Sequence, residues 1–163
     1  MKKNQSIGER KFTEEKNAPA VLVSACLLGV SCKYDGGDNQ SDEILRLGQK
    51  VRLIPVCPEQ LGGLSTPRPP AEIRDGRVYT KNDDDVTEQF QKGAEEALHL
   101  AQLFGCRCAV LKARSPSCGT KMIYDGTFSG RKVSGSGITA ALLKENGISV
   151  YSEEEYKDHM ASF

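Results

Sequence analysis

The chain has 163 residues, in which 22 Lys and Arg balance 22 Asp and Glu, so its formal net charge is zero. A balanced charge argues against general nucleic-acid binding, which needs a concentrated basic surface to displace counterions. Charged residues make up 27% of the chain, and no apolar run approaches the roughly 18 residues of a membrane span, which excludes a membrane protein. We expect one soluble domain that binds neither nucleic acid nor a membrane.

The beginning of the chain and its cysteines suggest a compartment. Met1-Lys2-Lys3-Asn4 is not followed by the apolar segment of a secretory signal, so we expect a cytoplasmic protein. Six cysteines in a reducing compartment are poor candidates for a disulfide framework and are better interpreted as metal ligands or reactive thiols. The cysteines are therefore the first place to look for function.

The order of the expected elements points to a parallel sheet. Residues 1–18 are charged and poor in apolar side chains, which predicts a disordered tail. In chain order we then expect a strand at 20–25, a helix at 42–49, a strand at 52–56, a helix at 86–104, a strand at 108–113, a helix at 138–145 and a strand at 148–151. Short apolar strands that alternate with helices are typical of a parallel sheet covered by helices.

Turn signals complete the predicted architecture. Asp75-Gly76 and Asp125-Gly126 predict small hairpins, the first between residues 72–74 and 77–79 and the second between 122–124 and 127–128. The prolines at 66–70 predict a rigid loop. The sequence thus predicts an α/β domain at 19–155, a three-layer, mostly parallel sheet with helices on both faces (Rossmann-like) and small hairpin insertions, followed by a C-terminal tail at 156–163.

Three cysteines follow three of the predicted strands: Cys26 in SACLLG, Cys57 in PVCPEQLGG and Cys118 in KARSPSCG. The carboxyl ends of parallel strands meet at one edge of a sheet, where open α/β sheets bind ligands. Three thiolates gathered there suit an iron–sulfur cluster or a zinc ion, because both favour soft ligands. The alternative is that each cysteine is a small buried side chain without a metal.

The other cysteines are interpreted differently. Cys106 and Cys108 are too close together for the usual chelating spacing and lead into a strand, so we expect packing or surface thiols. Cys32, in GVSCKYDGG, is a candidate for a fourth ligand, a redox partner or a plain loop residue. With Cys32 as fourth ligand the metal site closes, which defines a competing function: a noncatalytic zinc or iron–sulfur binding module.

The chain resembles the 2-thiouracil desulfurase family over most of its length. The resemblance rests on SACLLGVSCKYDG at 24–36, PVCPEQLGGLSTPRPPAEI at 55–73, KARSPSCG at 112–119 and GSGITAALLKENGISVYSEEE at 135–155. It implies an enzyme with a 4Fe-4S cluster held by Cys26, Cys57 and Cys118 and with the fourth iron open. It also implies functional roles for Glu59 and Ser115.

The implied reaction is the non-redox desulfuration of a small thiolated nucleobase, in which the thiocarbonyl sulfur binds the open iron while water adds to the ring carbon. An open iron is a Lewis acid, and sulfur is a softer ligand for it than oxygen. Glu59 is the expected general acid or base, and Ser115 is expected to orient the substrate or relay a proton. The alternatives are a solvated loop carboxylate for Glu59 and a local turn hydrogen bond for Ser115.

Several further residues have competing interpretations. Arg68 and Glu72 either shape the pocket or are surface charges, as an ion pair or as two solvated side chains. Cys108 is separated by five residues from Arg114-Ser115, which is the spacing of a cysteine phosphatase loop, but the five intervening residues are expected to form a buried strand. A histidine-based hydrolase is disfavoured, since His99 is expected to face solvent and His159 falls in the predicted C-terminal tail.

Overall fold

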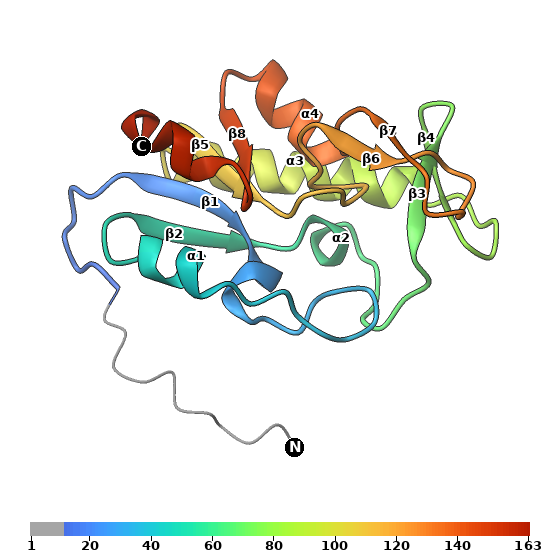
Figure 1. Ribbon diagram of the computed structural model, residues 1–163, viewed down its shortest axis with the longest axis horizontal. Helices are drawn as coiled ribbons and strands as arrows, with labels where there is room; N and C mark the ends of the chain where they lie inside the picture. The colour runs from blue at the N-terminus through green and yellow to red at the C-terminus, as the bar shows by residue number, and fades with distance from the viewer. Residues whose placement is uncertain (1–11) are drawn as a thin grey trace.

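Four parallel strands form the central sheet of the computed structural model, which describes residues 12–163 (Figure 1). The strands are β1 (Ala20–Ser24), β2 (Arg52–Val56), β5 (Cys108–Leu111) and β8 (Ser149–Ser152), in the spatial order β2-β1-β5-β8. In the central strand, Val21 is paired with Leu53 of β2 on one side and with Cys108 of β5 on the other. The predicted strands are confirmed to within two residues at each end.

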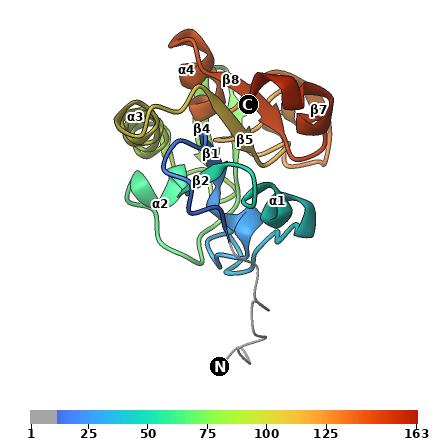
Figure 2. The ribbon, with the colours of Figure 1, turned by 90° about the vertical axis from the view of Figure 1, so that its left-hand side faces the viewer.

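Helices cover both faces of the sheet, as predicted (Figure 2). The helices are α1 (Asp42–Leu47), α2 (Pro58–Leu61), α3 (Thr87–Leu103) and α4 (Ile138–Glu145). Leu22 and Leu111 lie in the core that contains buried residues of α3 and α4, such as Ala97 and Leu143. Val23 lies in the core on the opposite face with residues of α1. Within residues 12–163, no helix has both the length and the apolar character needed to cross a bilayer.

The two ends of the chain differ from the predicted boundaries. The segment after residue 155, predicted to be a tail, contains the 3-10 helix Tyr156–Ser162, in which Tyr156 is buried and His159 stacks on Tyr151. Aromatic side chains in this otherwise polar segment give it an apolar face that packs on the sheet. Of the predicted N-terminal tail, residues 1–11 lie outside the described residues, and the N–H of Thr13 donates to the carbonyl oxygen of Gly48 at 2.8 Å.

Two hairpins extend from the central sheet. They are formed by β3 (Ala71–Arg74) with β4 (Arg77–Thr80) and by β6 (Met122–Tyr124) with β7 (Lys132–Ser134). The first is as predicted, but 127–128 is wrong as the second strand of the other hairpin. The carboxylate of Glu72 in β3 accepts hydrogen bonds from the N–H groups of Gly126 and Phe128 at 3.0 and 3.2 Å, which draws this segment toward the first hairpin.

The short helix α2 packs directly on α3 at a pair of glycines. A Cβ atom at Gly62 would overlap the carbonyl oxygen of Gln89, and a Cβ atom at Gly93 would overlap the carbonyl oxygen of Pro58. Glycine at both positions therefore lets the two backbones touch. This contact fixes the position of the residues that follow β2.

The connections of the sheet open a crevice at one edge. The chain passes from β1 through α1 to β2, and then returns through α3 to β5 on the other side of β1. At such a reversal of strand order, the loops after neighbouring strands leave toward opposite faces, and a crevice forms at the carboxyl ends of the strands. The segments that follow β1, β2 and β5 border this crevice.

Candidate active site

A cavity of about 510 Å³ lies at the carboxyl ends of β1, β2 and β5. Its wall contains every residue that the sequence analysis proposed for the site, namely Cys26, Cys57, Glu59, Ser115 and Cys118. Cys32 also lines the cavity. Cys108 instead opens β5, at the far end of that strand. The fold therefore brings the three motifs of the chain together at one place.

Each of the three cysteines is held by a short turn immediately after its strand. Cys26 lies in a 3-10 turn that ends at Gly29, whose φ of 88° is in the left-handed region that favours glycine. Cys57 is the extended residue at the start of α2, and Pro58 follows at the first helical position. Cys118 lies in a turn closed by a 2.8 Å hydrogen bond from the N–H of Gly119 to the carbonyl oxygen of Ser115.

The thiols of Cys26, Cys32 and Cys57 interact with one another. A hydrogen bond from the Cys32 thiol lowers the pKa of Cys26 to about 7 and that of Cys57 to about 6, although burial opposes both shifts. The same two contacts, first that with Cys26, raise the pKa of Cys32, which therefore remains a protonated donor. Asn39 Nδ2 also donates to Cys26 Sγ at 3.5 Å. The lowered pKa values of Cys26 and Cys57 favour the thiolate, the form that binds metals, although Cys57 Sγ also lies 3.8 Å from the carbonyl oxygen of Cys32 as a donor.

Cys118 has a different environment. Its side chain is buried, and burial raises the pKa of its thiol to about 12, against weaker contributions from the hydroxyl groups of Ser24 and Ser117. A metal reverses this balance, because coordination to a cation deprotonates a thiol outright. Of Cys26, Cys57 and Cys118, Cys118 is therefore the one whose ionisation would depend most on a bound cation.

The placement of the thiols on the wall of one cavity bears on the kind of metal centre that they could hold. Among residues 12–163, no three or more His, Cys, Asp or Glu side chains are grouped closely enough to hold one metal ion. A zinc ion requires its thiolates about 2.3 Å from one point. A 4Fe-4S cluster binds each cysteine through a different iron, so its ligands stand farther apart around a cavity. Three cysteines on the wall of one cavity are consistent with that requirement.

The carboxylate of Glu59 is fixed at both oxygens. Arg68 Nε donates to Oε1 at 3.0 Å, and Ser117 Oγ donates to Oε2, also at 3.0 Å. The side chains of Arg68 and Glu59 are only 6% and 15% exposed. The alternative of a solvated loop carboxylate is therefore wrong, and so is that of an exposed ion pair between Arg68 and Glu72.

Arg68 connects the two loops that carry cysteines. One terminal nitrogen of its guanidinium donates to the carbonyl oxygen of Cys32 at 2.8 Å, and the other donates to Thr66 Oγ1 at 2.9 Å. Its backbone N–H donates to the carbonyl oxygen of Tyr34 at 2.8 Å. Because Arg68 also holds Glu59, it links the loop after β1 to the helix after β2.

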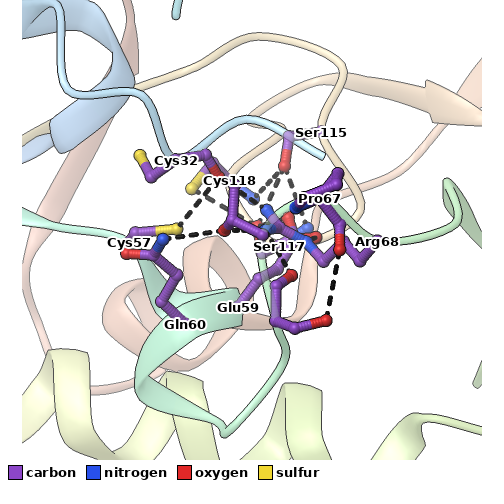
Figure 3. A network of polar contacts seen from close by, with 11 residues as sticks. Cys32, Cys57, Glu59, Gln60, Pro67, Arg68, Ser115, Ser117 and Cys118 are labelled. Carbon is purple, nitrogen blue, oxygen red and sulfur yellow. Dashed lines mark hydrogen bonds and ion pairs between the residues drawn. The ribbon is translucent and has the colours of Figure 1, made fainter. Parts of the chain in front are cut away.

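Ser115 and Ser117 continue the hydrogen-bonded network into the third loop (Figure 3). Ser115 Oγ accepts the N–H groups of Ser117 and Cys118 at 3.2 and 3.1 Å, which is the local turn interaction considered above as an alternative. It also lies 2.9 Å from Ser117 Oγ. Sequence reasoning missed Ser117, although Ser-Pro-Ser-Cys contains a second hydroxyl directly before the third cysteine.

Three glutamates after β8 brace the loop that carries Cys118. Their ion pairs join Glu153 to Lys112 at 2.6 Å, Glu154 to Arg114 at 2.7 Å and Glu155 to Lys121 at 2.8 Å. Lys112 and Arg114 line the cavity, so two of its cationic side chains are fixed by ion pairs with these glutamates. Aromatic rings of Tyr34, Tyr124 and Phe128 complete the wall, and such rings suit a flat heterocyclic ligand.

The structure supports neither a cysteine phosphatase loop at Cys108 nor a histidine-based hydrolase. The segment after Cys108 is the buried strand β5, so it does not wrap around a phosphate. His99 is exposed on α3, and His159 stacks on Tyr151 with ring centroids 4.4 Å apart. Neither histidine lines the cavity.

Comparisons with known proteins identify a family, a relative and a solved structure that are similar to this chain. A profile of the 2-thiouracil desulfurase family matches residues 21–155. The uncharacterized protein YbbK of Bacillus subtilis (strain 168) is 45% identical over 148 residues, which cover 85% of this chain and 98% of that protein. The solved structure of a [4Fe-4S]-dependent thiouracil desulfidase, TudS, is similar with a TM-score of 0.83 and 45% identity, over 88% of this chain and 97% of that chain. The family profile spans all three cysteine motifs of the cavity, and the chain belongs to the 2-thiouracil desulfurase family.

Proposed function

We propose that the protein desulfurates a small thiolated nucleobase of the 2-thiouracil type by a non-redox reaction. Water supplies the oxygen that replaces the thiocarbonyl sulfur, and sulfide is released. Membership of the family and the similarity to TudS, itself named as a [4Fe-4S]-dependent thiouracil desulfidase, support this function. The observation that carries it is the convergence of three cysteines and the fixed carboxylate of Glu59 on one cavity.

Cys26, Cys57 and Cys118 are the proposed ligands of a 4Fe-4S cluster. When bound through three thiolates, such a cluster supplies an iron with an open coordination position, which is a Lewis acid for soft sulfur. The lowered pKa values of Cys26 and Cys57 support two of these assignments. Asn39 Nδ2 donates to Cys26 Sγ at 3.5 Å, and Ser117 Oγ, whose proton goes to Glu59, lies 3.5 Å from Cys118 Sγ.

Glu59 is the proposed general acid or base, and Ser115 is the proposed partner that relays a proton or orients the substrate. General acid–base catalysis needs a group within reach of the reacting proton and held in one orientation. Hydrogen bonds from Arg68 and Ser117 give the Glu59 carboxylate that single orientation. Ser115 lies two hydrogen bonds from the same carboxylate and lines the cavity.

We further propose that the substrate is a free small molecule and that the protein works in the cytoplasm. Within residues 12–163 none of the six cysteines is joined in a disulfide, which is the state that a reducing compartment preserves. Two of the five cationic side chains that line the cavity, Lys112 and Arg114, are paired with Glu153 and Glu154. The formal net charge of zero provides no excess of positive charge for binding a nucleic acid.

The direct test is anaerobic purification and cluster reconstitution, followed by a screen of thiolated bases for sulfide release. We expect equal amounts of sulfide and oxo base without an added reductant. A Ser149→Ala variant is a matched control, because Ser149 is exposed at the start of β8, away from the cavity. A fully loaded protein that releases no sulfide from any thiolated base, or that needs a reductant, contradicts the proposal.

The contact of Cys32 with Cys26 and Cys57 also favours a second candidate, a noncatalytic module with four cysteine ligands. Metal analysis of Cys32→Ala separates the two. A structural site with four cysteines loses its metal in this variant, whereas a catalytic site with three cysteines keeps its iron and sulfide. Sulfide release by the loaded variant would exclude the noncatalytic function.

A further inference from the structure

A loop of residues 125–131 connects β6 to β7 and contributes Phe128 to the wall of the cavity. Hydrogen bonds close this loop: the N–H of Asp125 donates to the carbonyl oxygen of Arg131 at 3.0 Å, and the carboxylate of Asp125 accepts the N–H of Thr127 at 2.9 Å. Phe128 is partly buried, and it packs in none of the three apolar cores of residues 12–163. Core packing therefore does not explain the aromatic ring at this position.

The backbone of Phe128 is strained. Its φ of 57° lies in the left-handed region, where a bulky side chain is an outlier. Two other residues with such a φ, Asp75 and Asp83, have short polar side chains that tolerate this conformation. In the loop itself, glycine occupies the positions with φ values of 89° and 81°, Gly126 and Gly130. Strain of this kind is concentrated at functional sites, so it points to a role for the Phe128 ring in the cavity.

Glu72 fixes the backbone of Phe128 against the first hairpin. Its Oε1 atom accepts the N–H groups of Gly126 and Phe128 at 3.0 and 3.2 Å. A Cβ atom at Gly126 would lie only 2.7 Å from the carbonyl oxygen of Ile73, so glycine there lets the loop touch β3. The two hairpins lie side by side (Figure 1). The first hairpin therefore sets the position of Phe128 on the cavity wall.

We propose that Phe128 is a specificity-determining residue that stacks on the heterocycle of the substrate, and that Glu72 is the residue that positions it. This inference rests on the proposed function and deepens it, because it names the contact that recognises the ring of a thiolated nucleobase. Nucleobases stack on aromatic side chains through their flat faces, whichever polar groups they carry at their edges. Phe128 therefore selects planar, unsaturated rings, and it does not distinguish one planar thiolated base from another.

The first test separates recognition of the substrate from a structural role of the ring. We expect Phe128→Gly to raise the KM for 2-thiouracil roughly tenfold, with kcat and iron content unchanged, because a stacking contact with the base is lost. The unfolding midpoint of cluster-free protein should not fall, since glycine adopts a positive φ without strain. Phe128→Tyr keeps the ring and should restore the KM. A wild-type KM in Phe128→Gly, or a raised KM together with a lower unfolding midpoint, overturns the proposal.

A second test asks whether Phe128 recognises the flatness of the ring. The compound 5,6-dihydro-2-thiouracil has the same polar groups as 2-thiouracil, but its saturated carbon–carbon bond puckers the ring. Its inhibition constant against 2-thiouracil reports its binding, whether or not the compound is itself desulfurated. The wild type should bind 2-thiouracil more tightly than the dihydro compound, and Phe128→Gly should reduce this preference roughly tenfold. An equal preference in the two proteins overturns the proposal.

The positioning role of Glu72 is tested by substitutions alone and in combination. Glu72→Gln keeps a carbonyl oxygen that accepts two N–H groups, so it should retain the wild-type KM. Glu72→Ala removes the acceptor and should raise the KM, but not further in a protein that already carries Phe128→Gly. Losses that multiply in the double variant overturn the positioning role. Asp75→Gly is the matched control, because it relieves a φ of 51° at a residue that does not line the cavity.

Binding of uracil distinguishes failure of this inference from failure of the proposed function. Uracil has no sulfur to release, so calorimetry on the cluster-loaded protein measures its Kd without turnover. We expect the Kd to be roughly tenfold higher in Phe128→Gly than in the wild type. If it is, but the wild type releases no sulfide from 2-thiouracil, the proposed function fails and the stacking contact stands. If the wild type releases sulfide while the two proteins do not differ in their binding of uracil, the stacking contact is excluded and the proposed function stands.

Discussion

Cysteines lie at the carboxyl ends of the parallel strands (the carboxyl edge of the sheet) and at their amino ends (the amino edge). The pKa values of the cysteines compared at these two edges are shifted in opposite directions. At the carboxyl edge, the pKa values of Cys26 and Cys57 are lowered to about 7 and about 6. At the amino edge, burial raises the pKa of Cys106 to about 11 and also raises that of Cys108. The difference comes from the neighbours: a donating thiol at one edge and apolar burial at the other. Residue type alone therefore does not identify a ligand.

Cys118 shows the limit of this comparison. It lies at the carboxyl edge, yet burial gives it a raised pKa, like the cysteines of the amino edge. A positive metal centre would compensate for the loss of solvation when this buried thiol ionises. The carboxyl edge thus contains two thiols with a lowered pKa and one with a raised pKa.

The largest effect that distinguishes the two edges is the loss of the cluster. We expect replacement of Cys26, Cys57 or Cys118 by alanine to abolish the brown chromophore after anaerobic reconstitution, because three thiolates are the proposed ligands. A protein with both Cys106→Ser and Cys108→Ser should retain its iron and sulfide. Full iron in two of the three alanine variants would falsify the assignment, and iron loss in the double serine variant with an intact fold would refute the comparison.

The next effect concerns the chemistry at the carboxyl edge. Glu59→Gln keeps the size of the side chain and removes its titratable proton, so sulfide release should fall by about 10² to 10⁴-fold, or roughly 3 to 5 kcal/mol of barrier. Iron content should stay unchanged, since Glu59 is not a proposed ligand. Anaerobic turnover at equal cluster occupancy measures the effect. Wild-type turnover in this variant would remove Glu59 from the mechanism.

A smaller effect is expected on stability. Arg68→Ala leaves the carboxylate of Glu59 buried without its ion partner, which should lower the free energy of unfolding by about 3 kcal/mol. Urea unfolding of cluster-free protein measures this change. Arg77→Ala removes the exposed partner of Asp85 and should leave the unfolding midpoint unchanged. Equal effects of the two substitutions would show that the Arg68 pair is no more important than a surface pair.

The smallest expected effect is a difference in thiol reactivity. At pH 7, Cys57 is mostly thiolate, whereas only about 10⁻⁴ of Cys106 is, given their pKa values of about 6 and about 11. The lower nucleophilicity of the more acidic thiol offsets part of this difference, so alkylation of Cys57 should be roughly 50-fold faster. Mass spectrometry of cluster-free protein measures both rates. The ratio should fall toward one in urea, and a ratio near one in the folded protein contradicts the comparison.

Much of the fold could be predicted because its strands have local signals. The apolar runs at 20–25 and 108–113 and the helical pattern at 86–104 indicate their structures without reference to the rest of the chain. The second hairpin could not be placed in this way. The N–H groups of Gly126 and Phe128, just after its first strand, donate hydrogen bonds to Glu72, which lies more than 50 positions earlier in the sequence.

The candidate site was predictable to a similar degree. The cysteine positions after three strands, together with the family resemblance, indicated Cys26, Cys57 and Cys118. The contacts of Glu59 with Arg68 and Ser117 were not predictable, because they depend on how three loops meet in space. The C-terminal segment was mispredicted for a related reason: Tyr156 is one aromatic residue among polar neighbours, and only the sheet that it covers explains its burial.

The contact between α2 and α3 limits how this protein can be engineered for heat resistance. Replacing a glycine in a helix by alanine is a common stabilising change, with a typical gain of about 0.5 to 1 kcal/mol. Gly93, in the interior of α3, is an obvious target for that strategy. A methyl group there would overlap the carbonyl oxygen of Pro58, which lies between Cys57 and Glu59 in the chain. A substitution chosen for thermostability, on a helix remote in sequence, would thus displace a proposed ligand and the proposed base together.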